Sequence, residues 1–576
     1  MRTTDLPVRR WWRVLAVLAV LGIVAAACGG DDSGGDGGSG ADAADTAEAE
    51  GDPDEGETPQ YGGKIVFARE SETSNPFTPA AMSCDPACHH AVRTVYDTLT
   101  YLGEDAAAHP FLLESIEPNE DFTVWTLTAR EGITFHDGTP FDADAIVDHF
   151  ERMQAGLLVG LSLSDLEALT KVDAMTVDIT MAEPWSTFPL YLTAQPGYVA
   201  SPTWLAEVDA GTADPTEPVG TGPFVFAEFA TGDSLRVTRN DDYWLSDADG
   251  NQYPYLDEIE FVVLEEDLSR ERALVAGDID ITHTDKGESI LALREQVEAG
   301  DLEMYEIADR AETTYAMISL ADPDSPTSDV RIRQAMAYAT DQELRSQART
   351  AGVFEIANGP FPPGSPGHLD DNGWPEYDPA RATELVEEYK ADVGVDEVRI
   401  EIRTNADPDN RTTAELLQQM YEQVGIEVDI FQLEQAELIR SVATGDFQVT
   451  LWRRHGGATP EVERVYWHSD TVSPVGEIGL NFGRFEDDVI DDALDVLRAT
   501  QDPAVIQDEA ETINRRFAEQ VYNVWFDWIH WAVPHKSRVH GVQTPLALPD
   551  GTLGATDGIG YPGGISETQI WVDDAQ

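Results

Sequence analysis

The sequence is poor in basic residues and in cysteine. It has 36 lysines and arginines against 108 acidic residues, and only five of those bases are lysines. The resulting net charge of −72 excludes a nucleic-acid-binding surface and disfavours binding to anionic lipids through protein charge. Two explanations of the acid excess stay open: a saline habitat, or ordinary surface acidity encoded by a GC-rich genome.

Long hydrophobic runs are also missing beyond the first 27 residues, so no later segment is apolar enough to span a bilayer. The first 27 residues hold four arginines, followed by an unbroken apolar run of 14 residues, Val14 to Ala27. That run is too short for a membrane span but typical of a signal peptide. Three alanines then precede Cys28, as in bacterial lipoproteins. The sequence predicts a lipoprotein signal peptide over 1–27 and acylation of Cys28; a plain signal peptide cut near the alanines is the alternative.

The segment after Cys28 cannot form a core. Residues 29–60 are mainly Gly, Asp, Ser, Ala and Glu, with eleven acids and no base. Such a composition predicts a disordered acidic tether over 28–60. The chain is therefore expected to be held on the extracellular face of the cell membrane by its lipid anchor alone, or on the periplasmic face where an outer membrane exists.

Only Cys84 and Cys88 remain once Cys28 carries lipid. Two thiols four positions apart in an oxidising compartment predict one disulfide, with a modest entropic gain because the loop is short. The alternative is a metal site that adds His89 and His90, although this spacing matches no established zinc motif.

The body that follows mixes strands and helices. Residues 133–136 are expected to form a strand that enters an Asp-Gly turn, and Asp142 is expected to cap a helix. Alternating apolar residues at 398–402 and 426–430 predict strands, with helices over 411–424 and 434–443 and a further strand over 448–452. This β-α-β-α-β order implies parallel strands, which places a ligand near residues 452–457, beyond their carboxyl ends.

Several segments together resemble the peptide/nickel class, family 5, of ABC-importer solute-binding proteins. The segments are 130–145, 220–224, 239–244, 330–341, 377–382 and 425–428. Each is weak alone, but they occur in the family's order over about residues 61–572. The His136-Asp137 pair inside the first segment is interpreted as part of a fold-defining turn and not as a catalytic pair.

The resemblance implies an α/β fold, a periplasmic-binding-protein-like two-lobed clamshell with an inserted subdomain in lobe I. Lobe I is expected over 61–318, with the insertion at about 95–225, lobe II over 319–533, and a C-terminal return to lobe I over 534–576. The implied function is capture of oligopeptides or peptide-like solutes between the lobes and delivery to an ABC permease and its ATPase. The receptor is expected to be a monomer.

The family holds a peptide's amino terminus with an aspartate in the segment that corresponds to 450–461. No aspartate stands there; Trp452, Arg453, Arg454 and His455 do. We expect these four residues to contact ligand, with the arginines binding a carboxylate. The alternatives are that Trp452 belongs to the core and that the arginines pair with the abundant acids.

Further contacts are expected from Asn481 and Phe482 and, in lobe I, from Asn75, whereas the loop 358–364 is expected to be structural. A non-peptide ligand, such as an oligosaccharide, an opine-like acid or a metal chelate, is the alternative substrate. No nucleophile–base set, phosphate loop or metal motif is readable in the sequence. We therefore expect no enzymatic activity, no cofactor and no bound metal.

Overall fold

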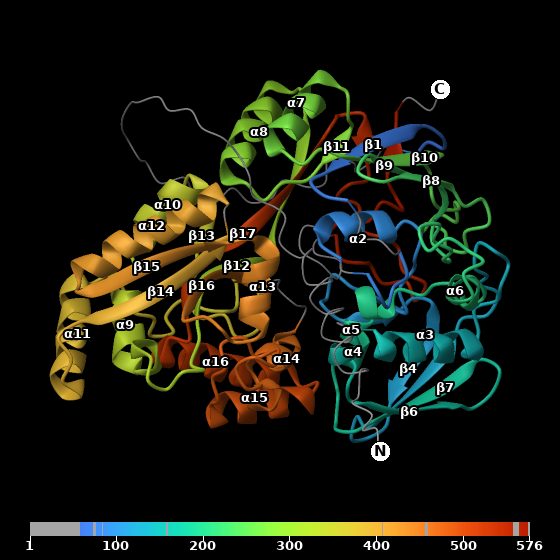
Figure 1. Ribbon diagram of the computed structural model, residues 1–576. Coiled ribbons are helices and arrows are strands. Elements are labelled where there is room, and N and C mark those ends of the chain that lie inside the picture. The colour runs from blue at the N-terminus through green and yellow to red at the C-terminus, as the bar shows by residue number, and fades with distance from the viewer. Residues whose placement is uncertain are drawn as a thin grey trace, which may run out of the picture.

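The protein was studied as a computed structural model that describes residues 58–72, 77–82, 84–156, 159–405, 407–454, 459–556 and 564–573. Two lobes share one sheet of eleven strands (Figure 1). Its order is β15 (Ile426–Leu433), β14 (Val398–Asn405), β16 (Val449–Arg454), β12 (Glu303–Ile318), β17 (Asn523–His535), β11 (Ile281–Thr282), β1 (Lys64–Arg69), β10 (Glu258–Val263), β9 (Ser234–Arg239) and β8 (Phe224–Ala230), with β13 (Glu355–Ile356) on β17.

Strands β12 and β17 run through both lobes. Residues 303–307 of β12 pair with 531–535 of β17 on the side where β11 adjoins β17. Residues 312–317 pair with 523–529 on the other side, where β16 adjoins β12. The register shifts between Ile307 and Glu312, so the two stretches are separated by an irregular segment. The sheet is thus continuous between the lobes, and its irregular segment lies where the lobes join.

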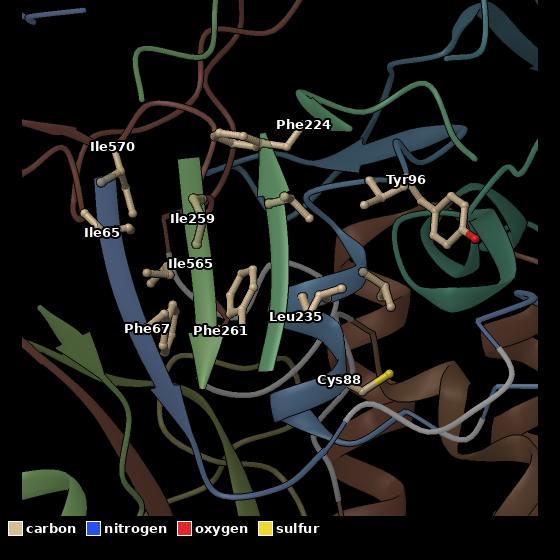
Figure 2. Close-up of a cluster of buried hydrophobic side chains, with 14 of the residues drawn as sticks. Ile65, Phe67, Cys88, Tyr96, Phe224, Leu235, Ile259, Phe261, Ile565 and Ile570 are labelled. Atoms are coloured by element: carbon tan, nitrogen blue, oxygen red, sulfur yellow. The ribbon is translucent and has the colours of Figure 1, made fainter. Parts of the chain in front are cut away.

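Lobe I packs around β1 and its parallel partners β10 and β11. Its core combines the first strand with residues near the C-terminus, as Figure 2 shows for Ile65, Phe67, Ile565 and Ile570. Residues near the C-terminus therefore share a core with the first strand. The other elements of this lobe are α2 (Pro86–Val92), α6 (Pro202–Asp209), α7 (Asp267–Ala276), α8 (Gly287–Ala299), β18 (Val539–His540) and β19 (Trp571–Val572).

A second, smaller antiparallel sheet lies within the segment expected to be an insertion. Its order is β4 (Leu113–Pro118), β5 (Val124–Ala129), β7 (Thr176–Met181) and β6 (Leu166–Lys171). It has its own apolar cluster, to which α3 contributes Ile146, Phe150 and Met153. We call residues 95–225 the inserted subdomain. It also contains β2 (Thr100–Leu102), β3 (Ala108–Pro110), α3 (Ala143–Ala155), α4 (Val159–Ser162), α5 (Phe188–Tyr191) and η1 (Gln195–Gly197), as well as α6, whose Trp204 and Leu205 pack into the main lobe I core.

The expected strand over 133–136 is wrong, because the segment makes only one bridged pair across the turn before His136 bonds to another part of the chain. Phe135 and Thr139 close the turn, and the backbone N–H of His136 donates to the carbonyl of Gly220 at 2.9 Å. A single bridge between Thr134 and Pro140 is all the pairing it makes. The expected helix cap is correct, since the Asp142 side chain accepts from two backbone N–H groups of α3.

Glycines at 220 and 222 are required by the close approach of the Val95 backbone. A Cβ atom added to Gly220 or Gly222 would lie 2.0 or 2.6 Å from the carbonyl oxygen of Val95. The His136 ring also contacts the Gly222 carbonyl at 3.0 Å. Two of the family-like segments are therefore packed against each other, and His136 lies in the fold-defining turn that the sequence predicted.

Lobe II contains the predicted β-α-β-α-β unit. Strand β14 pairs in parallel with both β15 and β16. Apolar residues of α9, α11 and α12 cover one face of the sheet, and those of α13 to α16 cover the other. The helices are α9 (Val330–Ala339), α10 (Gln342–Thr350), α11 (Pro379–Val393), α12 (Pro408–Gln423), α13 (Gln435–Ala443), α14 (Arg464–Trp467), α15 (Asp488–Arg498) and α16 (Pro503–Gln520), with short turns η2 (Pro326–Ser328), η3 (Pro460–Glu463) and η4 (Ser469–Thr471).

Candidate functional site

The carboxyl end of β16 carries three of the predicted ligand residues. Strand residues alternate between the two faces of a sheet, so Trp452 and Arg454 lie on one face and Arg453 on the other. Trp452 pairs with Tyr315 of β12, and Arg453 pairs with Thr314. The two adjacent arginines therefore have different neighbours and cannot act as one bidentate pair toward a single group.

Arg453 is bound to two carboxylates. Its guanidinium donates to Asp285 at 2.9 Å and to Glu312. Both acids are buried, Glu312 completely. Burial opposes charge on Asp285, but the nearby Lys286 and Arg453 outweigh burial and lower the pKa of this carboxyl. The charge on Arg453 is thus matched within the protein, by Asp285 of lobe I and by Glu312 of β12, which runs through both lobes.

Arg454 is bound on the opposite face. It pairs with Glu463 at 2.5 Å, donates to the Pro360 carbonyl at 2.9 Å and lies over the Trp467 ring at 5.0 Å. Burial raises the pKa of Glu463, and the charge of Arg454 opposes that effect. The Pro360 contact gives the loop 358–364 a structural role. Both arginines therefore form the ion pairs that the sequence left open as an alternative.

An aromatic group lies beside Arg454. The Trp452 and Phe482 rings meet edge to face at 5.9 Å, and the Phe482 and Tyr466 rings lie 6.0 Å apart. All three retain solvent exposure, and the Tyr466 residue is 40% exposed. Aromatic faces with this exposure can pack against a planar or apolar group of a ligand. Trp452 also packs against the lobe II core, which is the alternative that the sequence left open for this residue.

Asn481 is placed differently from Phe482. Its side chain is fully buried and donates to the backbone carbonyls of Phe485, at 2.9 Å, and Trp467, at 3.3 Å. In this conformation Asn481 holds the loop that presents Phe482. Three other predicted positions, Cys28, Asn75 and His455, lie outside the described residues, as do the signal peptide and the tether up to residue 57.

Cys84 and Cys88 form a disulfide, with their Cα atoms 5.0 Å apart. This is the pairing that the sequence favoured over a metal site. Among the side chains that the structure describes, no group of three or more His, Cys, Asp or Glu is placed to hold a metal ion. None of the described helices is both long enough and apolar enough to cross a membrane.

The lobes also touch away from β16, a contact that the sequence did not predict. The backbone N–H of Ser186, in the inserted subdomain, donates to the carbonyl of Arg498 in lobe II at 2.8 Å. The Arg498 guanidinium pairs with Asp165 of the inserted subdomain. One feature of the sequence pointed toward such contacts: 31 of the 36 basic residues are arginine, the residue best suited to buried ion pairs.

Comparisons with known proteins agree with this architecture. The chain is 25% identical over 486 residues to di/tripeptide-binding protein 2 of Pseudomonas aeruginosa, covering 80% of this chain and 87% of the relative. The fold is similar to that of the periplasmic binding protein DppA of Helicobacter pylori in complex with peptide STSA, with a TM-score of 0.72, 20% identity, and coverage of 86% and 98% of the two chains.

A second similar structure is AgaA of A. tumefaciens R10 in complex with agropinic acid, with a TM-score of 0.70, 23% identity, and coverage of 83% of this chain and 94% of that one. The model of bacterial extracellular solute-binding proteins, family 5 Middle, matches residues 107–475, well over half of the sequence. The expected clamshell is confirmed, and the chain belongs to family 5 of the bacterial extracellular solute-binding proteins.

Proposed function

We propose that this protein is a receptor that captures oligopeptides or peptide-like solutes between its two lobes and delivers them to an ABC permease. The observation that supports this most is the pair of strands β12 and β17, which join two otherwise separate cores into a sheet with an irregular segment at the junction. A ligand that contacts both lobes favours their closed arrangement, because only that arrangement offers all of its contacts.

The ligand would lie against the aromatic group of Trp452, Phe482 and Tyr466. Peptides suit such an aromatic surface because their side chains vary while their backbone groups repeat. The ion pairs of Arg453 and Arg454 weigh against capture of a free carboxylate by these residues. An incoming anion would have to displace Asp285, Glu312 or Glu463, all of which are buried.

The second candidate is a non-peptide ligand without a free amine, such as an opine-like acid, an oligosaccharide or a metal chelate. Two observations favour it: residues 450–461 contain no aspartate to hold an amine, and the fold is similar to that of a protein in complex with agropinic acid. Either way the protein acts as a binding receptor and not as an enzyme. Acylated Cys28 would hold it as a monomer on the outer face of the membrane.

A thermal-shift screen of the lipid-free chain tests the proposal, since a ligand raises the free energy of unfolding by RT ln(1 + [L]/Kd). The screen would contain di- to nonapeptides, amino-terminally blocked peptides, opine-like acids, oligosaccharides and nickel chelates. Stabilisation by free peptides supports the first candidate, and stabilisation only by amine-free ligands supports the second. Turnover of a stabilising ligand would overturn the receptor role.

A further inference from the structure

The inserted subdomain and lobe II meet through a compact set of polar contacts. Ser186 makes three hydrogen bonds with lobe II. Its N–H donates to the Arg498 carbonyl at 2.8 Å, its hydroxyl donates to the Thr500 carbonyl, and its own carbonyl accepts from Gln501 at 2.9 Å. Figure 1 places α14 and α15 of lobe II beside α4 and α5 of the inserted subdomain.

Arg498 stands at the centre of this set. Its guanidinium pairs with Asp165 of the inserted subdomain and with Glu461 of lobe II, and it lies over the Trp185 ring at 4.2 Å. Thr187 adds a hydrogen bond across the interface, because its hydroxyl donates to Glu461 at 2.5 Å. Arg498 is 6% exposed, and Glu461 and Trp185 are fully buried. These groups are buried by the contact of one lobe with the other.

We infer that this set of residues, namely Asp165, 185–187, Glu461, Arg498, Thr500 and Gln501, is an interlobe latch that holds the protein closed without ligand. Opening the lobes would break the Asp165–Arg498 and Thr187–Glu461 contacts and the hydrogen bonds of Ser186. The closed arrangement is therefore populated before any ligand arrives. The apparent Kd of a ligand that binds only the closed arrangement equals its intrinsic Kd divided by the closed fraction. A large closed fraction therefore keeps the apparent Kd close to the intrinsic Kd.

The latch makes Arg498 and Asp165 positioning residues that set affinity without touching the ligand. The side chains of Arg498 and Asp165 contact Glu461, Trp185 and each other, all of them outside the aromatic group of Trp452, Phe482 and Tyr466. Only the effect on ligand affinity rests on the proposed function. The closed population itself can be measured on the protein alone, so the two ideas fail independently.

The test is the double variant Asp165→Asn/Thr187→Val of the full chain. It removes two cross-lobe contacts and leaves the Arg498–Glu461 pair intact. The matched control is Asp178→Asn/Thr126→Val, which removes an Asp–Thr hydrogen bond of 2.7 Å inside the inserted subdomain. Hydrogen exchange of the peptide that contains Ser186 reports the cross-lobe bond directly. Small-angle scattering reports the separation of the lobes.

Without ligand, we expect the variant to exchange the Ser186 amide roughly tenfold faster than the control and to have a larger radius of gyration. Its affinity for a peptide found in the screen should fall by about tenfold. If the double variant unfolds at a lower urea concentration than the control, Gln501→Leu replaces it, because Gln501 is exposed and its loss leaves the buried ion pairs in place. Unchanged exchange and scattering in both variants would overturn the latch.

Discussion

The hydroxyl of Tyr243 donates a hydrogen bond of 2.9 Å to the buried carboxylate of Asp97, 146 positions earlier in the chain. Trp244 and Thr221 donate to the same carboxylate at 2.9 Å each. Two family-like segments, 220–224 and 239–244, thus converge on one acid. Burial raises the pKa of Asp97, while these three hydrogen bonds oppose the rise. These two segments therefore supply the hydrogen bonds that satisfy the buried Asp97 carboxylate.

Replacing Asp97 is therefore expected to be costly. Asp97→Ala leaves three donors without an acceptor, two of them on the buried residues Tyr243 and Thr221, which should lower the free energy of unfolding by about 3–5 kcal/mol. Asp97→Asn should cost less, because the amide oxygen can still accept from Trp244 and Thr221 while its N–H group faces the Tyr243 hydroxyl, which can accept. Urea unfolding measures both. Exposed Asp249→Ala is the control and should change stability by less than about 0.5 kcal/mol. A loss as small as the control's would contradict this role of Asp97.

The Arg454–Glu463 pair predicts that a second substitution, at Glu463, restores the stability lost on replacing Arg454. Arg454→Met leaves the buried Glu463 carboxylate uncompensated and should cost about 3 kcal/mol at neutral pH, measured by urea unfolding. Adding Glu463→Gln removes the buried charge and should recover most of that loss. Arg515→Met is the control, because its pair with Glu511 is exposed and worth little. Absence of rescue would show that Arg454 acts mainly through its other contacts.

His149 predicts a pH dependence of stability. Burial lowers its pKa to about 4, and its Nε2 lies 2.9 Å from the Pro196 carbonyl. An unfolded histidine takes up a proton as the pH falls through about 6.5, whereas folded His149 stays neutral until about 4. Its contribution to stability is thus present above pH 6.5 and is lost as the pH falls toward 4, by about 2 kcal/mol at pH 5.

His149→Gln should remove that part of the loss while keeping a donor for Pro196. The quantity to compare is the difference in free energy of unfolding between pH 7.5 and pH 5. His109→Gln is a control of opposite sign: partial burial opposes its charge, but hydrogen bonds with Asp105 and Asp550 raise its pKa overall. That variant should lose more stability on acidification than the wild type. An unchanged pH difference in His149→Gln would refute the assignment.

Reduction of the Cys84–Cys88 disulfide should have a limited effect. The closed loop is short, so the chain-entropy model gives a loss of about 2 kcal/mol for the Cys84→Ser/Cys88→Ala variant. The buried position of Cys88 favours alanine over serine there. Unfolding with and without dithiothreitol provides the measurement. The stability of the variant should not change with dithiothreitol. A change would show that the reductant destabilises the protein by a route other than this disulfide.

The expected lipid anchor on Cys28 predicts that replacing this residue releases the protein from the membrane. Cys28→Ala should prevent acylation, so that the protein appears in the medium, or in the periplasm of a cell with an outer membrane. Fractionation followed by immunoblotting locates the protein, and intact mass of the wild type identifies the modification. Ser33→Ala, a change in the same segment, should leave the protein on the membrane. An unacylated wild-type N-terminus at another residue would exclude this anchor.

Local patterns were enough to predict the β-α-β-α-β unit of lobe II. Its strands alternate regularly, and the predicted helix over 411–424 lies close to the observed α12. The course of β12 was harder to predict, because the charged residues around Glu306 and Glu312 interrupt its alternation. The sheet that pairs it with β17 depends on contacts more than two hundred residues apart in the chain.

The partners of the arginines could not be predicted at all. Arg453 pairs with Asp285 and Glu312, which lie 168 and 141 positions away. With 108 acids in the chain, composition favours some ion pair for every arginine without indicating which. The same holds for Arg498, whose partner Asp165 lies 333 positions away. Sequence patterns located the carboxyl end of β16, but tertiary packing decided which charges remain available there.

The return of the C-terminal segment to lobe I has a consequence for synthesis. Ile565, Ile570 and Val572 complete the same core as Ile65 of the first strand, and β17 lies between β11 and β12 of the main sheet. The earliest part of the body therefore cannot finish folding until almost the last residue is available. A ribosome-bound or partly exported chain would expose an unfinished apolar surface, which a chaperone can hold and a protease can cut. The order in which this core is assembled therefore keeps the chain from completing its fold until its synthesis is almost finished.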